Sequence, residues 1–216
     1  MKRSSLLAFL LFLSSYSLPA EQRLDEILTA MKNAGDQLST LSANFEQTHH
    51  DHIMDENETS TGVLYYKVPG RIRWEYEHPF PKVLLVKDDK IRLFNPVANQ
   101  VQEFKKGQMK GAGADLLIGF GRSNAEMGKN YDVRLKEESS DSVTLLLIPK
   151  PGSSASLFKA IELTMDKKRW IPLRSVFHEA NRDTTEIIFK DIEVNEDLPA
   201  GCFELELPPN VEIVRG

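Results

Sequence analysis

Cysteine is nearly absent from this 216-residue chain, since Cys202 is the only one. A single cysteine excludes an internal disulfide, so an apolar core must hold the fold together. A chain of roughly 200 residues is long enough to bury such a core. The neighbours of Cys202 in the sequence include no histidine or lysine close by, which favours a buried or incidental thiol over a reactive one.

Long apolar runs are lacking too, except at the N-terminus. Lys2 and Arg3 precede the run Leu6–Leu13, and small residues and a proline follow up to Ala20. This order is that of a secretory signal peptide, and the run is too short for a permanent membrane anchor. We predict cleavage after Ala20, or as a second choice after Ser17. Residues 1–20 are then the signal peptide, and residues 21–216 form a single exported domain.

Basic residues are outnumbered by acidic ones, and they form no cluster. Removing residues 1–20 takes away two basic residues and no acidic one, which leaves 25 basic against 32 acidic residues and a formal net charge of −7. An acidic chain without a basic cluster is a poor candidate for binding nucleic acid. Export without disulfides fits a bacterial periplasm better than a small secreted scaffold.

Enzyme signatures are missing as well. The sequence contains no Gly-x-Ser-x-Gly, no phosphate-binding loop, no dinucleotide glycine fingerprint and no His-Glu-x-x-His. His50 and His52 would share one face of a strand and suggest a metal pair. The polar segment that follows supplies no carboxylate or cysteine at ligand spacing, so we expect neither a metal site nor a catalytic residue.

What is present is alternation, most clearly in residues 62–100. Apolar and aromatic residues alternate with polar ones there, in four short runs separated by turn signals. The alternation predicts strands with one buried face, and tight turns between neighbours make them antiparallel. The alternate residues expected to face inward are Leu64, Tyr66 and Val68 in one run and Ile72, Trp74 and Tyr76 in the next.

Other segments complete the pattern. Leu24, Ile27, Leu28, Met31 and Leu38 recur at helical spacing, with Gly35 expected to weaken the helix or end it early. Residues 41–51 read as a strand with Phe45 as its large apolar residue, and residues 55–58 as a polar loop. Residues 115–120 read as a short apolar helix flanked by glycines. Five further strands follow between Tyr131 and Val194, and the chain ends in a possible edge strand.

The count is ten or eleven strands, nearly all with short connections, and so many antiparallel strands must curl or close. The fold class is therefore mainly β, a strongly curved antiparallel sheet with helices at its mouth. Its inner aromatic face either lines a cavity for an apolar ligand or simply fills a core. Both interpretations stay open on the residues alone.

The whole of residues 21–216 resembles the LolA family of periplasmic outer-membrane lipoprotein carriers. The resemblance lies in the order and spacing of several motifs, namely residues 43–47 (ANFEQ), 67–74 (KVPGRIRW), 94–100 (FNPVANQ), the short helix at 115–120, and residues 191–195 (DIEVN) leading to Phe203 and Pro208. It implies an incomplete, strongly curved β-barrel whose short helices form a lid over an apolar cavity.

The resemblance also implies a function and site residues. Such carriers take acylated lipoproteins from an inner-membrane ABC transporter, shield their acyl chains and pass them to an outer-membrane receptor. The cavity candidates become Phe45, Leu64, Tyr66, Ile72, Trp74, Tyr76 and Leu84, and the lid candidates Leu116, Leu117 and Phe120. No cofactor and no enzymatic activity are implied, and we expect a monomer.

One position departs from the family pattern. Well-known members have an arginine immediately before the proline of the 67–74 motif, where it ties the barrel wall to the lid, and here that position is Val68. Arg71 and Arg73 have the opposite parity to Trp74 and should point outward. Lid closure by apolar contact alone is then expected. Because of this departure, a second interpretation stays open, in which the protein is a carrier or a sensor of another lipid-type amphiphile.

Overall fold

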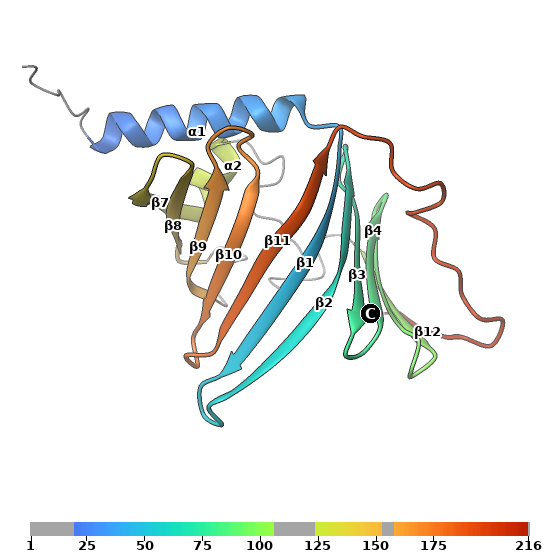
Figure 1. Cartoon of the computed structure of the whole chain (residues 1–216). Helices are drawn as coiled ribbons and strands as arrows, with labels where there is room; N and C mark the ends of the chain where they lie inside the picture. Colours follow the sequence, from blue (N-terminus) through green and yellow to red (C-terminus); the bar gives the residue numbers. More distant parts are fainter. Residues whose placement is uncertain (1–19, 106–123, 153–157, 216) are drawn as a thin grey trace, which may run out of the picture.

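The computed structural model describes residues 20–105, 124–152 and 158–215, and it is dominated by one sheet. Its elements, in chain order, are α1(Ala20–Gln37), β1(Thr40–Asp51), β2(Glu56–Lys67), β3(Arg71–His78), β4(Lys82–Lys87), β5(Lys90–Asn95), β6(Gln100–Lys105), α2(Asn124–Asn130), β7(Tyr131–Glu138), β8(Ser142–Pro149), β9(Phe158–Asp166), β10(Pro172–Glu179), β11(Thr184–Val194) and β12(Glu212–Arg215). Figure 1 shows the sheet curving beneath α1.

The twelve strands form a single sheet in the order β12-β6-β5-β4-β3-β2-β1-β11-β10-β9-β8-β7. β2 to β6 and β7 to β10 are two meanders of hairpin neighbours. They meet at the pair β1–β11, where Phe45 lies opposite Phe189. β7 and β12 are the edges of the described sheet, so the curved sheet stays open, as expected for an incomplete barrel.

The main core lies on the concave side of the sheet. Alternate residues of each strand point there, because successive side chains of a strand face opposite ways. Ile27 and Met31 of α1 and Met127 of α2 join this cluster, so both helices cover part of the concave side. An ion pair between Arg23 and Glu138 also ties α1 to the edge strand β7. None of the described helices has the length and apolar content needed to cross a membrane.

A second, smaller cluster lies on the convex side. Val83, Phe94 and Val101 form it, and Leu205, Leu207 and Val211 pack against it. The segment from Asn195 to Val211 runs from the end of β11 across the outside of the sheet to β12 (Figure 1). β4 is therefore buried on both faces, which explains its unbroken apolar run Val83–Val86.

The curved, mainly β antiparallel architecture is as predicted, but several details differ. α1 continues through Gly35 to Gln37, because packing of its apolar face outweighs the roughly 1 kcal/mol helix penalty of one glycine. β2 starts at Glu56, within the polar loop predicted at residues 55–58, since residues 56–60 pair with the polar end of β1. Across the described ranges the sheet has twelve strands instead of ten or eleven, and the predicted edge strand β12 pairs with β6 in parallel.

Glu103 gives the fold a testable acid sensitivity. Its carboxylate accepts hydrogen bonds from Lys90 at 2.9 Å and Arg92 at 2.8 Å, and Arg215 of β12 lies 3.6 Å away. The hydrogen bonds from Lys90 and Arg92 lower the pKa of Glu103 to about 2, whereas an unfolded glutamate has a pKa of about 4.3. Ionised Glu103 therefore stabilises the fold above about pH 4.3, and this contribution is lost as the pH falls toward 2.

We expect Glu103→Gln to unfold at lower urea concentration than wild type at pH 7, and to show a smaller loss of stability between about pH 4.5 and pH 2. Urea titrations at several pH values measure both. Glu77→Gln, at an exposed position near the end of β3, is the matched control and should keep the wild-type pH profile. An unchanged profile in Glu103→Gln would show that this cluster does not carry the acid response.

Candidate functional site

The seven residues predicted to line a cavity lie together on the concave face of neighbouring strands. All are buried and belong to the same cluster: Phe45 on β1, Leu64 and Tyr66 on β2, Ile72, Trp74 and Tyr76 on β3, and Leu84 on β4. In register, Trp74 lies opposite Leu64 on one side and Leu84 on the other. The face is therefore a continuous apolar surface across four strands.

Aromatic rings meet at the centre of this face. The centroid of Phe45 lies 4.9 Å from that of Trp74 and 5.0 Å from that of Tyr76. Phe189 of β11 lies 6.0 Å from Trp74. Phe189 was missed from the sequence, although its parity with Ile187 on β11 was the available signal. The four rings join the two meanders across the β1–β11 pair.

Gly62 lets these rings meet. It lies on β2, opposite Phe45 of β1 and Tyr76 of β3. With no side chain on the intervening strand, rings from β1 and β3 can touch across it. The backbone is also very close here, because a Cβ at Gly62 would stand 1.9 Å from the carbonyl oxygen of Glu75. Residue 62 must therefore be glycine for β2 and β3 to keep this spacing.

Two polar groups lie within the aromatic cluster. The hydroxyl of Tyr76 donates a hydrogen bond to Gln47 Oε1 at 2.9 Å, and burial raises the pKa of Tyr76 to about 12. Nε1 of Trp74 is the only buried side-chain nitrogen or oxygen in the described residues without a hydrogen-bond partner. At the rim, Lys82 Nζ lies 4.2 Å from the centroid of the Tyr76 ring.

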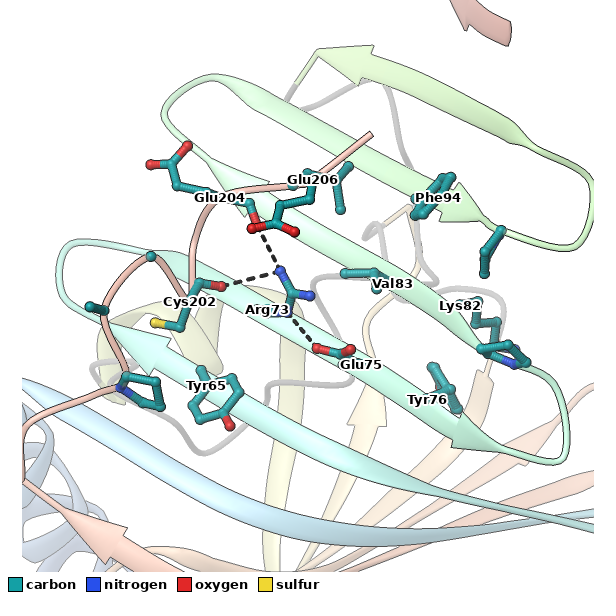
Figure 2. A pocket seen from close by; sticks show the side chains of 16 residues that line it. Tyr65, Arg73, Glu75, Tyr76, Lys82, Val83, Phe94, Cys202, Glu204 and Glu206 are labelled. Carbon is teal, nitrogen blue, oxygen red and sulfur yellow. Dashed lines mark hydrogen bonds and ion pairs between the residues drawn. The ribbon is translucent and has the colours of Figure 1, made fainter. Parts of the chain in front are cut away.

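The lid candidates Leu116, Leu117 and Phe120, with the short helix predicted around them, lie outside the described residues. Val68 follows the end of β2 and is about 43% exposed, rather than continuing the inward row. Arg73 points outward, as predicted from its parity (Figure 2). Its Nη1 donates to the carbonyl oxygens of Cys202 at 3.3 Å and Glu204 at 2.9 Å.

Arg73 thus holds the C-terminal segment on the convex face. A pocket of about 390 Å³ lies there, between strands β2 to β5 and residues 199–206, and Figure 2 shows Glu75, Glu204 and Glu206 around Arg73. A second pocket, of about 500 Å³, lies between the C-terminal half of α1 and the turn that carries Trp170. Both are distinct from the concave aromatic face.

The other sequence candidates are dispersed. His50 Nδ1 lies 2.9 Å from Asn57 Oδ1, while His52 stands in the turn after β1, with its Nε2 3.4 Å from Arg182 Nη1. The described ranges contain no group of three or more potential metal ligands. Burial raises the pKa of the Cys202 thiol, which disfavours the reactive thiolate. The feature that stands out is the apolar face, which suits a hydrocarbon ligand.

Comparisons with known proteins agree with this geometry. The model of the family "Outer membrane lipoprotein carrier protein LolA" matches residues 36–206. An outer-membrane lipoprotein carrier protein of Chromohalobacter salexigens is 29% identical over 178 residues, which cover 82% of this chain and 81% of that protein. Another, from Dechloromonas aromatica, is 27% identical over 190 residues, covering 88% and 86%.

Solved structures share the fold at low sequence identity. An uncharacterized conserved protein from Thermus thermophilus superposes with a TM-score of 0.60 at 16% identity, covering 90% of this chain and all of that one. The Pseudomonas aeruginosa MucA/MucB complex contains a chain that matches with a TM-score of 0.51 at 16% identity, covering 85% and 61%. With the family match spanning residues 36–206, the chain belongs to the LolA family of outer-membrane lipoprotein carrier proteins.

Proposed function

We propose that this protein is a periplasmic carrier, which binds the acyl chains of lipoproteins on its concave face and moves them from the inner to the outer membrane. The observation that carries the proposal is the continuous apolar face formed by β1 to β4 in a chain of this family. Residues 1–20 act as the signal peptide, and residues 21–216 are the exported carrier. The role is transport, not catalysis.

Energetics favour partial burial of the cargo. Burying hydrocarbon gains about 0.8 kcal/mol per CH₂, and three long chains fully buried would exceed the roughly −20 kcal/mol limit of noncovalent binding. A carrier must also release what it binds. The seven face residues are buried in this state, so the cargo must displace whatever covers them. We assign that movement to a lid containing Leu116, Leu117 and Phe120.

The route requires two partners, an inner-membrane ABC transporter that loads the protein and an outer-membrane receptor that unloads it. A monomer meets this need, because the whole apolar face belongs to one chain. With Val68 in the position of the family arginine, closure of the lid rests on apolar contact. Opening of the lid then breaks no ion pair at this position. We therefore expect the affinity for cargo to change little with salt concentration.

Co-purification tests the proposal. The exported protein is isolated from a periplasm, and the bound fraction is identified by intact-protein and lipid mass spectrometry. We expect acylated lipoproteins with the wild type and at least a tenfold lower yield with Leu117→Glu, because a charge on the lid opposes contact with acyl chains. Phe80→Glu is the matched control, since Phe80 is about 68% exposed, and should retain the cargo.

Each other outcome has a definite meaning. A uniform free lipid or glycolipid in the bound fraction would replace the lipoprotein proposal with a carrier, or a sensor, of another amphiphile. A protein that comes out empty and also fails to bind an apolar dye would show that the aromatic face is a filled core. A complex of femtomolar affinity that never exchanges would contradict partial burial.

A further inference from the structure

The indole of Trp74 combines deep burial with an unused hydrogen-bond donor. The side chain is about 1% exposed, and its Nε1 has no hydrogen-bond partner within the described structure. A buried N–H group without an acceptor is costly, and native proteins nearly always satisfy such groups. Trp is also donor-only at this atom, so only an acceptor can satisfy it.

Most of the surroundings of Trp74 are apolar. Its register neighbours on β2 and β4 are Leu64 and Leu84, and the rings of Phe45 and Phe189 pack against it. None of these four side chains carries a hydrogen-bond acceptor.

Two polar groups lie close by, and neither satisfies the indole. The amide oxygen of Gln47 already accepts the hydrogen bond of Tyr76. The Tyr76 hydroxyl is near enough to Trp74 to oppose part of the rise in the pKa of Tyr76, yet Nε1 of Trp74 and this hydroxyl do not meet in hydrogen-bond geometry. No well-aligned acceptor meets Trp74 Nε1 among the described residues, which leaves this donor available to a molecule that binds to the face.

We propose that Trp74 Nε1–H donates a hydrogen bond to an ester or amide carbonyl of a bound acyl group, and so fixes how deep the acyl chain lies. This inference rests on the carrier function proposed above and adds a specificity-determining contact to it. The hydrocarbon tail lies along Leu64, Leu84 and Ile72, while the carbonyl faces the indole. Esters and amides of fatty acids are then preferred over alkyl chains that are attached without a carbonyl.

The electrostatics of the face favour a neutral acceptor. Burial raises the pKa of Tyr76 to about 12, which means that the same surroundings disfavour an anion. Lys82, whose Nζ lies 4.2 Å from the centroid of the Tyr76 ring, is at the exposed rim. A carboxylate therefore stays at the rim, whereas an uncharged carbonyl can reach Trp74.

Two probes that differ only in the carbonyl test the inference. One is a synthetic lipopeptide whose N-terminal cysteine carries two ester-linked chains, and the other is its diether analogue with the same chain lengths and the same free amino group. We expect the wild type to bind the first about fivefold more tightly. Trp74→Phe, which keeps an aromatic ring and loses the N–H, should weaken binding of the first probe about fivefold and leave the second unchanged.

Trp170→Phe serves as the control. It changes the only other tryptophan, which lies in the turn between β9 and β10, outside the strands β1 to β4 that form the apolar face. It should not alter the ratio of the two affinities. A phospholipid with ester-linked chains is a third ligand, and its competition with the lipopeptide shows whether the carbonyl comes from lipoprotein or from membrane lipid.

A spectroscopic readout in the wild type keeps the test independent of mutant folding. The chain has two tryptophans, and Trp170→Phe assigns their two indole N–H proton signals. The Trp74 signal should move downfield with the ester probe and not with the ether probe. If the two probes bind with equal affinity and shift the Trp74 signal equally, the proposed hydrogen bond is refuted. The proposed carrier function is not affected by that result. Failure of the wild type to bind either probe would overturn the carrier itself.

Discussion

Gly62→Ala should lower the free energy of unfolding by about 3 kcal/mol, the largest effect we expect from adding a single methyl group to this protein. The added Cβ would stand 1.9 Å from the carbonyl oxygen of Glu75 and 2.9 Å from Cα of Tyr76. Both are backbone atoms, so β2 and β3 must move apart. Because Phe45 and Tyr76 touch across Gly62, their contact is lost at the same time.

Gly128→Ala is the matched control for this change. Gly128 lies in α2, and a Cβ there would meet nothing within 4 Å. The substitution should stabilise the protein by about 0.5–1 kcal/mol, since alanine is the better helix former. Urea unfolding of both variants measures the two effects. Equal stability of Gly62→Ala and wild type would mean that the close approach of β2 and β3 is not required.

Phe45→Ala should cost about 3–5 kcal/mol of unfolding free energy. Phe45 is about 2% exposed and touches two rings, those of Trp74 and Tyr76. Removing it leaves a cavity between β1 and β3, which Gly62 cannot fill. The same substitution at the exposed Phe80 should change stability by about 0.5 kcal/mol or less.

Thermal and urea unfolding compare the two phenylalanine variants directly. The cavity left by Phe45→Ala should also take up a small apolar probe such as benzene, because apolar cavities in proteins stay dry and bind such molecules. Benzene should then raise the melting temperature of Phe45→Ala and leave that of Phe80→Ala unchanged. Similar costs at the two positions would show that the aromatic face is loosely packed.

Local alternation was sufficient to predict most of the sheet. Parity alone identified Leu64, Ile72 and Trp74 as inward-facing, and it identified Arg73 as outward-facing, because one face of those strands is wet or only thinly covered. It also predicted the meander, since short turns allow only antiparallel neighbours. The run Val83–Val86 carried a further signal, because an unbroken apolar strand indicates burial on both faces.

What could not be predicted depends on contacts far apart in the sequence. The parallel pairing of β12 with β6 follows from the path of residues 195–211 over the convex face, which no local pattern encodes. The polar start of β2 has no buried face, so its residues show no alternation of apolar and polar side chains that would predict a strand. In the site, Gly62 gains its role from the rings of Phe45 and Tyr76 on the two neighbouring strands. Gln47 gains its role from the Tyr76 hydroxyl on β3, and Phe189 from the pairing of β11 with β1.

The pairing of β1 with β11 also sets the order in which the chain can fold. Leu41 pairs with Val194 across most of the sequence, whereas each meander needs only neighbouring strands. Loop closure makes distant pairs slow to form, so we expect the two meanders to form first and to join last. In the export proposed above, the N-terminal half would arrive in the new compartment before β11 does. The apolar face between Phe45 and Trp74 would then stay uncovered until β11 has crossed, and this interval would be when the protein most needs protection from aggregation.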